Sequence, residues 1–252
     1  MLAPLEQFQI LSILSFKIFG LDFSFTNFLL MNILVLVTIT NIIYFNSLSN
    51  NYLKEVSFYF ISNSWQKLFE IVSEITAQII SDTIMKSNEK FFPVILVLFN
   101  FIFFSNFLGL IPYSFTATSH LFVTFTLSFS VFIGINVITI QKYRLKIFSL
   151  FCPANTSLFL ALILIPIEFV SYIAKPVSLG VRLFINLMAG HTLLKVIIGF
   201  SWSMLLLQNF ISLGLVIPML TLVFLFGLEL GVALIQTYVF VILTCIYVQD
   251  GS

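Results

Sequence analysis

The sequence predicts an all-α integral membrane protein of about six helices, folded as a single membrane domain over residues 1–252. Charged residues make up 8% of the chain, against about 25% in soluble domains. Hydrophobic residues make up 60%, and they recur in runs near the roughly 20 residues that cross a hydrocarbon core. The runs lack the alternation typical of a transmembrane β-barrel. Helices must therefore cross the membrane several times.

The first apolar run long enough to cross the membrane covers residues 26–46. Its Asn and Thr side chains can be satisfied by neighbouring helices. Residues 52–88 then interleave acidic and basic residues with Phe and Ile, a pattern typical of an amphipathic helix on the membrane surface. We therefore expect one N-terminal transmembrane helix followed by one surface helix.

A transmembrane hairpin is predicted over residues 91–111 and 121–140, two uncharged apolar runs. The loop YSFTATSH between them carries no Lys or Arg, and we expect His120 at its end to be solvated. A short basic loop follows the second run, with Lys142, Arg144 and Lys146. The positive-inside rule places this loop on the side of protein synthesis and the N-terminus on the opposite side.

The rest of the chain holds two long apolar stretches, 157–200 and 204–248, separated only near the sequence FSWS. At about 1.5 Å per residue each stretch would exceed about 60 Å as one helix, twice the hydrocarbon thickness. Pro166, Pro176 and Pro218 permit kinks. We therefore expect a hairpin of two helices that tilt strongly or break.

Arg182 lies in the middle of the first long stretch, among Val, Leu, Phe and Ile. A buried Arg in a membrane helix costs about 2.5 to 3.5 kcal/mol on insertion scales, and it does not deprotonate in proteins. One interpretation is a structural Arg that reaches the interface or pins two helices through an ion pair. The other is a functional cation, which the central position favours.

Glu168 and Asn186 share the helix face of Arg182, since they lie 14 residues before it and four residues after it. They would form a polar stripe along the bundle interior. Glu168 can equally be an interfacial carboxylate at a helix start. Lys175, just before Pro176, is interpreted as a side chain that extends to the interface.

Glu229 and Gln236 lie seven residues apart on one face of the second long stretch. A carboxylate in this apolar setting is a candidate proton relay or one half of a structural ion pair. His191 is half a turn out of phase with Arg182, so it could instead meet Glu229 from the neighbouring helix. A neutral core histidine that donates to a carbonyl is the alternative.

Other classes of chemistry have no motif in the sequence. Walker and GxGxxG loops are absent, and Cys152 and Cys245 lie in no metal-ligand pattern. A net charge of +1 gives no electrostatic reason for nucleic-acid binding. We therefore expect no cofactor, no metal and no catalytic site. Buried acids and bases without these motifs indicate an ion or proton pathway.

Several segments resemble subunit a of F-type ATP synthase, especially its mitochondrial form. The segments SLGVRLFINLMAGH and LELGVALIQTYVF resemble its two signature helices. The resemblance extends to PLEQFQI near the start, to the run from FFPVILVLF to TATSH, and to KPVSLGVRLF. It covers nearly the whole chain and implies a non-catalytic subunit that couples proton flow to ATP synthesis.

The resemblance also implies roles for individual residues. Arg182 matches the arginine that faces the carboxylates of the rotating c-ring and separates two proton half-channels, and Asn186 and Gln236 match polar positions at that contact. Glu168 matches an acidic position of the release half-channel. His191 and Glu229 match a His/Glu pair of the proton-uptake half-channel.

The resemblance implies a place in a large hetero-oligomeric complex. Its partners would be the c-ring, the peripheral stalk, other Fo subunits and lipid. The expected location is the mitochondrial inner membrane, with several membrane passes and the N-terminus facing the intermembrane space. The alternative is a free-standing proton-coupled transporter or channel.

Overall fold

The structure is a computed structural model that describes residues 6–18, 21–52, 64–83, 90–111, 114–144, 158–206 and 213–251. Six α-helices dominate these ranges: α1 (Asn27–Tyr52), α2 (Ser64–Thr83), α3 (Phe92–Gly109), α4 (Leu121–Tyr143), α6 (Leu158–Leu206) and α7 (Leu213–Gly251). The predicted all-α membrane fold is confirmed. Four of these helices are long and apolar enough to cross a membrane, namely α3, α4, α6 and α7. In α1 the residues with described side chains include one apolar helix of fewer than 18 residues, Asn27–Asn41, so its crossing remains a prediction.

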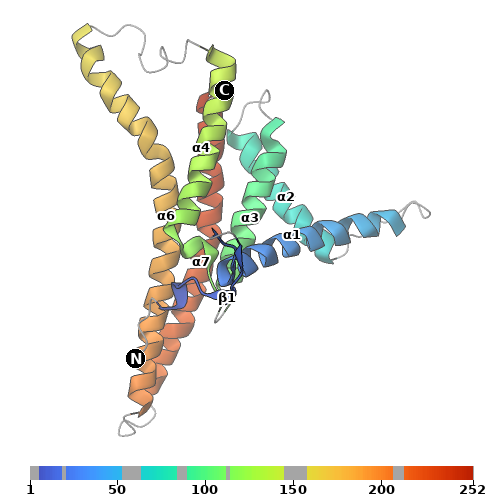
Figure 1. Cartoon of the computed structure of the whole chain (residues 1–252), viewed down its shortest axis with the longest axis vertical. Helices are drawn as coiled ribbons and strands as arrows, with labels where there is room; N and C mark the ends of the chain where they lie inside the picture. The colour runs from blue at the N-terminus through green and yellow to red at the C-terminus, as the bar shows by residue number, and fades with distance from the viewer. Residues whose placement is uncertain are drawn as a thin grey trace.

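The long helices α4, α6 and α7 run side by side, whereas α1 points away from them at a large inclination (Figure 1). α6 packs on both α4 and α7, and α3 packs on α7. Gly180 allows the close approach of α6 to α4, because a Cβ there would lie 2.7 Å from Oγ of Ser128 and 3.0 Å from the Thr124 carbonyl oxygen. The three helices therefore form one tightly packed body.

Two apolar clusters form the core of the described part of the chain. One joins α3, α6 and α7 through Ile102, Leu179, Leu183, Leu187 and Phe240. The other joins α2, α3 and α7 through Ile79, Ile80, Ile95, Phe99, Val241 and Cys245. Cys245 is a free thiol with no exposed surface, which agrees with its interpretation as an apolar filler. Cys152 lies outside the described residues.

The helix α2 is amphipathic. Ile79 and Ile80 are buried against α3 and α7, whereas Lys67, Glu70 and Glu74 are exposed. Charges therefore collect on the side of α2 that faces away from the bundle. The predicted surface helix covered 52–88, but residues 53–63 and 84–88 lie outside the described residues.

Both long apolar stretches are unbroken helices over their described residues. The predicted connection at FSWS is wrong, because α6 continues through Phe200–Ser203 to Leu206. Ser201 and Ser203 donate hydrogen bonds to the carbonyls of Ile198 and Phe200, at 2.7 and 2.8 Å, so their hydroxyls are satisfied within the helix. With 49 residues in α6 and 39 in α7, both helices are longer than an upright helix needs to cross a hydrocarbon layer of about 30 Å. Their steep tilt stays a prediction.

The N-terminal segment contains structure that the sequence did not predict. A short 3-10 turn, η1 (Glu6–Phe8), precedes four short strands: β1 (Ser12–Leu14), β2 (Lys17–Ile18), β3 (Leu21–Asp22) and β4 (Phe25–Thr26). β1 pairs with β4, and β2 pairs with β3, both antiparallel. Asn27 ties these strands to α1, since its amide donates to the Gln9 carbonyl at 3.1 Å and its Oδ1 accepts from the Leu11 N–H at 3.1 Å.

Candidate functional site

Polar side chains from α6 and α7 meet within an otherwise apolar interface. Nδ2 of Asn186 on α6 donates a hydrogen bond of 2.8 Å to Oε1 of Gln236 on α7. Gln236 is buried, and the neighbouring Leu183 and Leu187 are only 2% exposed. The sequence predicted that Asn186 and Arg182 share one face of the first long helix, and that Gln236 and Glu229 share one face of the second. The structure brings these two faces together.

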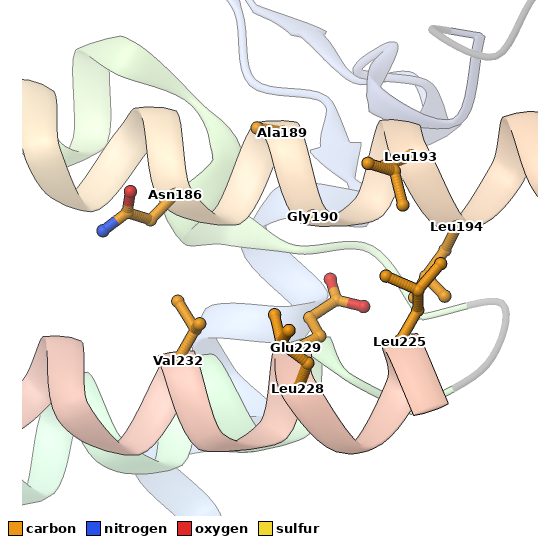
Figure 2. A pocket seen from close by; sticks show the side chains of 9 residues that line it. All are labelled: Asn186, Ala189, Gly190, Leu193, Leu194, Leu225, Leu228, Glu229 and Val232. Atoms are coloured by element: carbon orange, nitrogen blue, oxygen red, sulfur yellow. The ribbon is translucent and has the colours of Figure 1, made fainter. Parts of the chain in front are cut away.

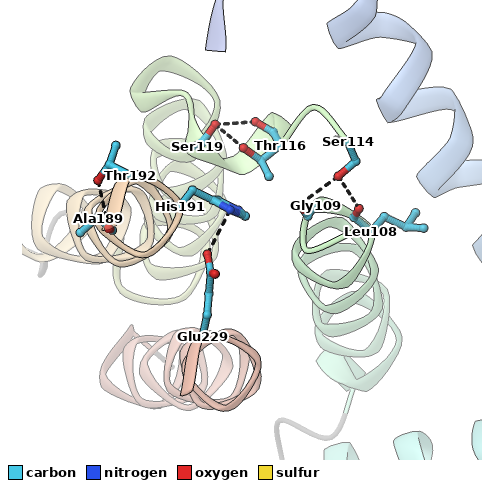
Figure 3. Close-up of polar contacts among 9 residues, drawn as sticks. All are labelled: Leu108, Gly109, Ser114, Thr116, Ser119, Ala189, His191, Thr192 and Glu229. Carbon is cyan, nitrogen blue, oxygen red and sulfur yellow. Dashed lines mark hydrogen bonds and ion pairs between the residues drawn. The ribbon is translucent and has the colours of Figure 1, made fainter. Parts of the chain in front are cut away.

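His191 and Glu229 also meet across the two long helices (Figure 3). Nδ1 of His191 lies 3.0 Å from Oε1 of Glu229, and the two side chains are 14% and 4% exposed. The sequence predicted this contact as one of two alternatives, because His191 lies half a helical turn away from the face of Arg182. A base and an acid at hydrogen-bonding distance, sheltered from bulk solvent, can pass a proton from one to the other.

Gly190 provides the space for Glu229. A Cβ at this position would lie 3.0 Å from Oε1 of Glu229 and 3.2 Å from its Cδ. At Gly227 and Gly231, which flank Glu229 in the sequence, a Cβ would meet nothing within 4 Å in the described part of the chain. It is therefore Gly190, on the neighbouring helix α6, that leaves room for the carboxylate.

A pocket of about 230 Å³ opens beside Glu229, between α6 and α7 (Figure 2). Its walls are mostly apolar, and Asn186 and Glu229 contribute the polar groups; it is lined by Asn186, Ala189, Gly190, Leu193, Leu194, Leu225, Leu228, Glu229 and Val232. Ala189, Leu193 and Leu228 are exposed. The pocket therefore opens on the outer face of the helix pair.

Arg182 lies one helical turn before Asn186, and its side chain is exposed. Ile185 next to it is 51% exposed, so the cation lies on an apolar outer face. Within the described ranges, no hydrogen bond or ion pair joins Arg182 to another residue. The ion pair that would make Arg182 a structural clamp between its own helices is therefore absent from this part of the chain.

Several buried polar atoms near the turn between α3 and α4 lack hydrogen-bond partners. The short 3-10 turn η3 (Ala117–Ser119) lies in this region and packs against α6. The buried atoms without a hydrogen-bond partner are Oδ1 of Asn106, Oγ1 of Thr118, Nε2 of His120, Nε2 of His191 and both carboxylate oxygens of Glu229, although Oε1 of Glu229 lies within ion-pair distance of His191. Buried polar atoms in proteins are normally bonded to protein or to ordered water. These atoms are therefore candidates for hydrogen bonds to ordered water.

The sequence did not single out Asn106 or Thr118, and its expectation for His120 is wrong. Nδ2 of Asn106 donates to Oγ1 of Thr237 at 3.3 Å, which fixes the amide inside the bundle. His120 is half-buried, with its ring stacked on Phe115 at 5.0 Å and edge-on to Phe28 at 6.3 Å. Burial lowers the pKa of His120 below its ordinary value of 6.5. In the sequence, hydroxyl residues surround Phe115 in SFTATSH. This mixture of an aromatic residue with small polar residues was the signal that could have indicated a buried turn.

Glu168 and Lys175 lie toward the other end of α6. Glu168 is half-buried, and no contact joins it to Arg182 among the described residues. The Lys175 ammonium lies 5.8 Å from the Tyr172 ring and 5.0 Å from the Tyr247 ring. The Tyr172 hydroxyl donates a hydrogen bond to Oδ1 of Asn136. The Lys175 side chain therefore lies against aromatic rings of α6 and α7.

The described residues contain no group of three or more His, Cys, Asp or Glu side chains that could hold a metal ion. His191 and Glu229 alone give two ligands, and structural zinc sites use four.

Together, the helices and these side chains define a multi-pass membrane protein. Its two long helices carry an exposed arginine and, between them, an acid-base pair.

Comparison with known proteins identifies the family. The family model described as "ATP synthase A chain" matches residues 28–249, and the chain belongs to this family. It is 45% identical over 251 residues to "ATP synthase subunit a" of Pylaiella littoralis, covering 99% of this chain and 97% of the relative. It is 43% identical to the protein of the same name from Chondrus crispus, over 98% of this chain and 95% of the relative. The relative from Marchantia polymorpha is 41% identical over 99% of this chain and 97% of its own length.

Proposed function

We propose that this chain is the proton-translocating subunit a of an F-type ATP synthase, which provides two offset half-channels to a rotating c-ring. Its partners are the c-ring, the peripheral stalk and the other subunits of the Fo sector. Family membership and the names of the relatives support the subunit role. The resemblance to the mitochondrial form supports the mitochondrial inner membrane, and the basic loop with Lys142, Arg144 and Lys146 supports an N-terminus toward the intermembrane space.

The exposed Arg182 is the observation that carries this proposal. A permanent cation on an apolar outer face requires a counter-charge or water. Among the described residues no acid of its own chain supplies one. An acid on a neighbouring protein supplies it instead, and the carboxylates of a c-ring pass this face one after another.

Proton uptake takes place through the His191–Glu229 pair. The unpartnered atoms of Asn106, Thr118 and His120 support a water path from the turn between α3 and α4 to this pair. The proton reaches His191 first and then Glu229, 3.0 Å away. From Glu229 it passes through the pocket to a ring carboxylate, which becomes neutral and turns away into lipid.

Proton release takes place on the Glu168 side. A ring carboxylate that approaches Arg182 is favoured in its ionised form by the nearby cation. Its proton then leaves through water near Glu168, while the Asn186–Gln236 hydrogen bond holds α6 and α7 together between the two paths. Each proton delivers about 2.3 kcal/mol per 100 mV of membrane potential, provided that no direct leak joins the half-channels.

The test uses Arg182→Ala and Arg182→Gln in the assembled complex, reconstituted into vesicles. We expect both variants to assemble and to abolish ATP synthesis driven by an imposed proton gradient, because the ring carboxylate then has no cation that favours loss of its proton. Substantial gradient-driven synthesis by either variant refutes the assigned role. Co-purification in mild detergent distinguishes this function from a free-standing transporter, which would be isolated without a c-ring.

A further inference from the structure

The turn η1 lies next to the His191 imidazole. Phe8 is 9% exposed, and its ring centroid lies 6.4 Å from that of the His191 imidazole, with an angle of 57° between the planes. The Lys195 ammonium lies 5.6 Å from the centroid of the same Phe8 ring. One aromatic side chain from the N-terminal segment therefore contacts both His191 and Lys195.

The cation at position 195 lies close to the proton-carrying pair. Lys195 is four residues after His191, so both side chains lie on one face of α6. Lys195 acts electrostatically on His191, and the Glu6 carboxylate of η1 acts electrostatically on Lys195. Phe8 attracts the ammonium to its ring face. The N-terminal segment thus supplies both a ring and a counter-charge to Lys195.

We propose that Phe8 is a positioning residue for proton uptake, which holds the Lys195 ammonium beside the His191 imidazole. This inference rests on the proposed function of the His191–Glu229 pair. A proton on the imidazole lies next to a second cation, and the two repel each other. The proton therefore passes on to the Glu229 carboxylate instead of remaining on His191.

Other titratable groups surround the same imidazole. On the elements packed around His191 they are Glu229 of α7, Lys195 of α6, Glu6 of η1 and His120 at the end of the turn that contains η3. Of these, Lys195 carries the positive charge that Phe8 contacts. A change at Phe8 therefore acts on His191 through Lys195.

The test compares Phe8→Leu and Phe8→Tyr in the full complex, reconstituted into vesicles. Leu keeps apolar volume but removes the ring face, whereas Tyr keeps the ring. We expect Phe8→Leu to lower gradient-driven ATP synthesis at least threefold, with the largest loss when the uptake side is most acidic. Phe8→Tyr restores most of the activity. Phe16→Leu is the matched control, because Phe16 is 56% exposed in the same segment, and it leaves the profile unchanged.

A double-mutant cycle with Lys195→Met separates positioning from packing. We expect Phe8→Leu to have little further effect once Lys195 has lost its charge, and Lys195→Arg to behave more like the wild type than Lys195→Met does. Equal losses from Phe8→Leu in both backgrounds, or equal defects in Leu and Tyr, overturn the proposal. If Phe8→Leu prevents assembly, measured by native electrophoresis, the comparison of Lys195→Met with Lys195→Arg decides, and identical pH profiles overturn it.

The same vesicles distinguish this inference from the proposed function. Glu229→Gln removes the acid of the pair and is expected to stop proton uptake. If Glu229→Gln is inactive and Phe8→Leu retains the wild-type profile, only the role of Phe8 is wrong. If Glu229→Gln keeps full activity, the proposed uptake path itself is wrong.

Discussion

Replacing Gly190 with Ala tests whether proton transfer depends on the contact between His191 and Glu229. The added Cβ would lie 3.0 Å from Oε1 of Glu229, and ordinary van der Waals contact begins at 3.4 Å. The carboxylate must therefore move by about 0.4 Å, the difference of these distances. Since Oε1 now lies 3.0 Å from Nδ1 of His191, the displacement lengthens and weakens this acid-base contact.

The magnitude is bounded by the strength of a charge-assisted contact between an acid and a base. A hydrogen bond to a charged group contributes about 1.5 to 3 kcal/mol, and each 1.4 kcal/mol corresponds to about a factor of ten. We therefore expect gradient-driven ATP synthesis to fall by about tenfold to a hundredfold. The helix itself gains, because Ala favours a helix interior over Gly by about 0.8 to 1.0 kcal/mol. The carboxylate is the flexible end of its side chain, so the fold accommodates the methyl group.

The assay measures ATP synthesis by reconstituted vesicles after an imposed pH jump, together with the thermal stability of the complex. Gly199→Ala is the matched control, because it lies on the same helix and its Cβ would meet no described residue within 4 Å. We expect Gly199→Ala to keep full activity with unchanged or higher stability. If Gly190→Ala is as active as Gly199→Ala, the reasoning about the His191–Glu229 contact is refuted.

Three further predictions concern packing, pH and leakage. Gly180→Leu should prevent α6 from packing on α4, because even a Cβ would lie 2.7 Å from Oγ of Ser128. We therefore expect the assembled complex to be lost in this variant. Gly134→Leu is the control and should assemble, because a Cβ there would meet no described residue within 4 Å. Burial lowers the pKa of His120 below 6.5, so its contribution to stability is present above pH 6.5 and is lost as the pH falls through the lowered pKa. His120→Phe should therefore reduce the drop in melting temperature between about pH 7.5 and about pH 5.5, and an unchanged drop contradicts this. Leu187→Asn should place a polar group in the apolar cluster of α3, α6 and α7. If this cluster separates the two proposed water paths, an imposed gradient is dissipated without ATP synthesis; tight vesicles contradict this.

The helical architecture could be predicted because a hydrocarbon layer leaves few options for an uncharged run. Runs of Phe, Ile, Leu and Val gave the positions of α3, α4, α6 and α7 to within several residues. The connection near FSWS could not be located, because serine hydroxyls that bond to carbonyls of their own helix make a polar sequence compatible with a continuous helix. The strands β1–β4 are only two or three residues long, and their pairing links residues 12 and 26, which local patterns do not reveal.

The site was predicted where helical phase decides which side chains meet. The residue spacing predicted that Asn186 shares a helix face with Arg182 and that Gln236 shares one with Glu229. It also predicted that His191 points away from the face of Arg182. The role of Gly190 was missed, because the space at one helix depends on the register of the other helix. Phe8 was missed for a similar reason, since 183 residues separate it from His191 in the sequence. Contacts between distant segments are set by tertiary packing rather than by local pattern.

Glu229 joins two environments that the helix pair otherwise keeps apart. On one side its Oε1 meets His191, close to the unpartnered polar atoms of the turn between α3 and α4. On the other side it lines the pocket that opens on the face of Arg182. Leu183, Leu187 and Phe240 are almost fully buried beside this contact and offer no polar atoms to water. Among the described residues, Asn186 is the only other polar side chain that lines this pocket, so the proposed coupling requires the acceptor of the Glu229 proton to belong to a partner that moves.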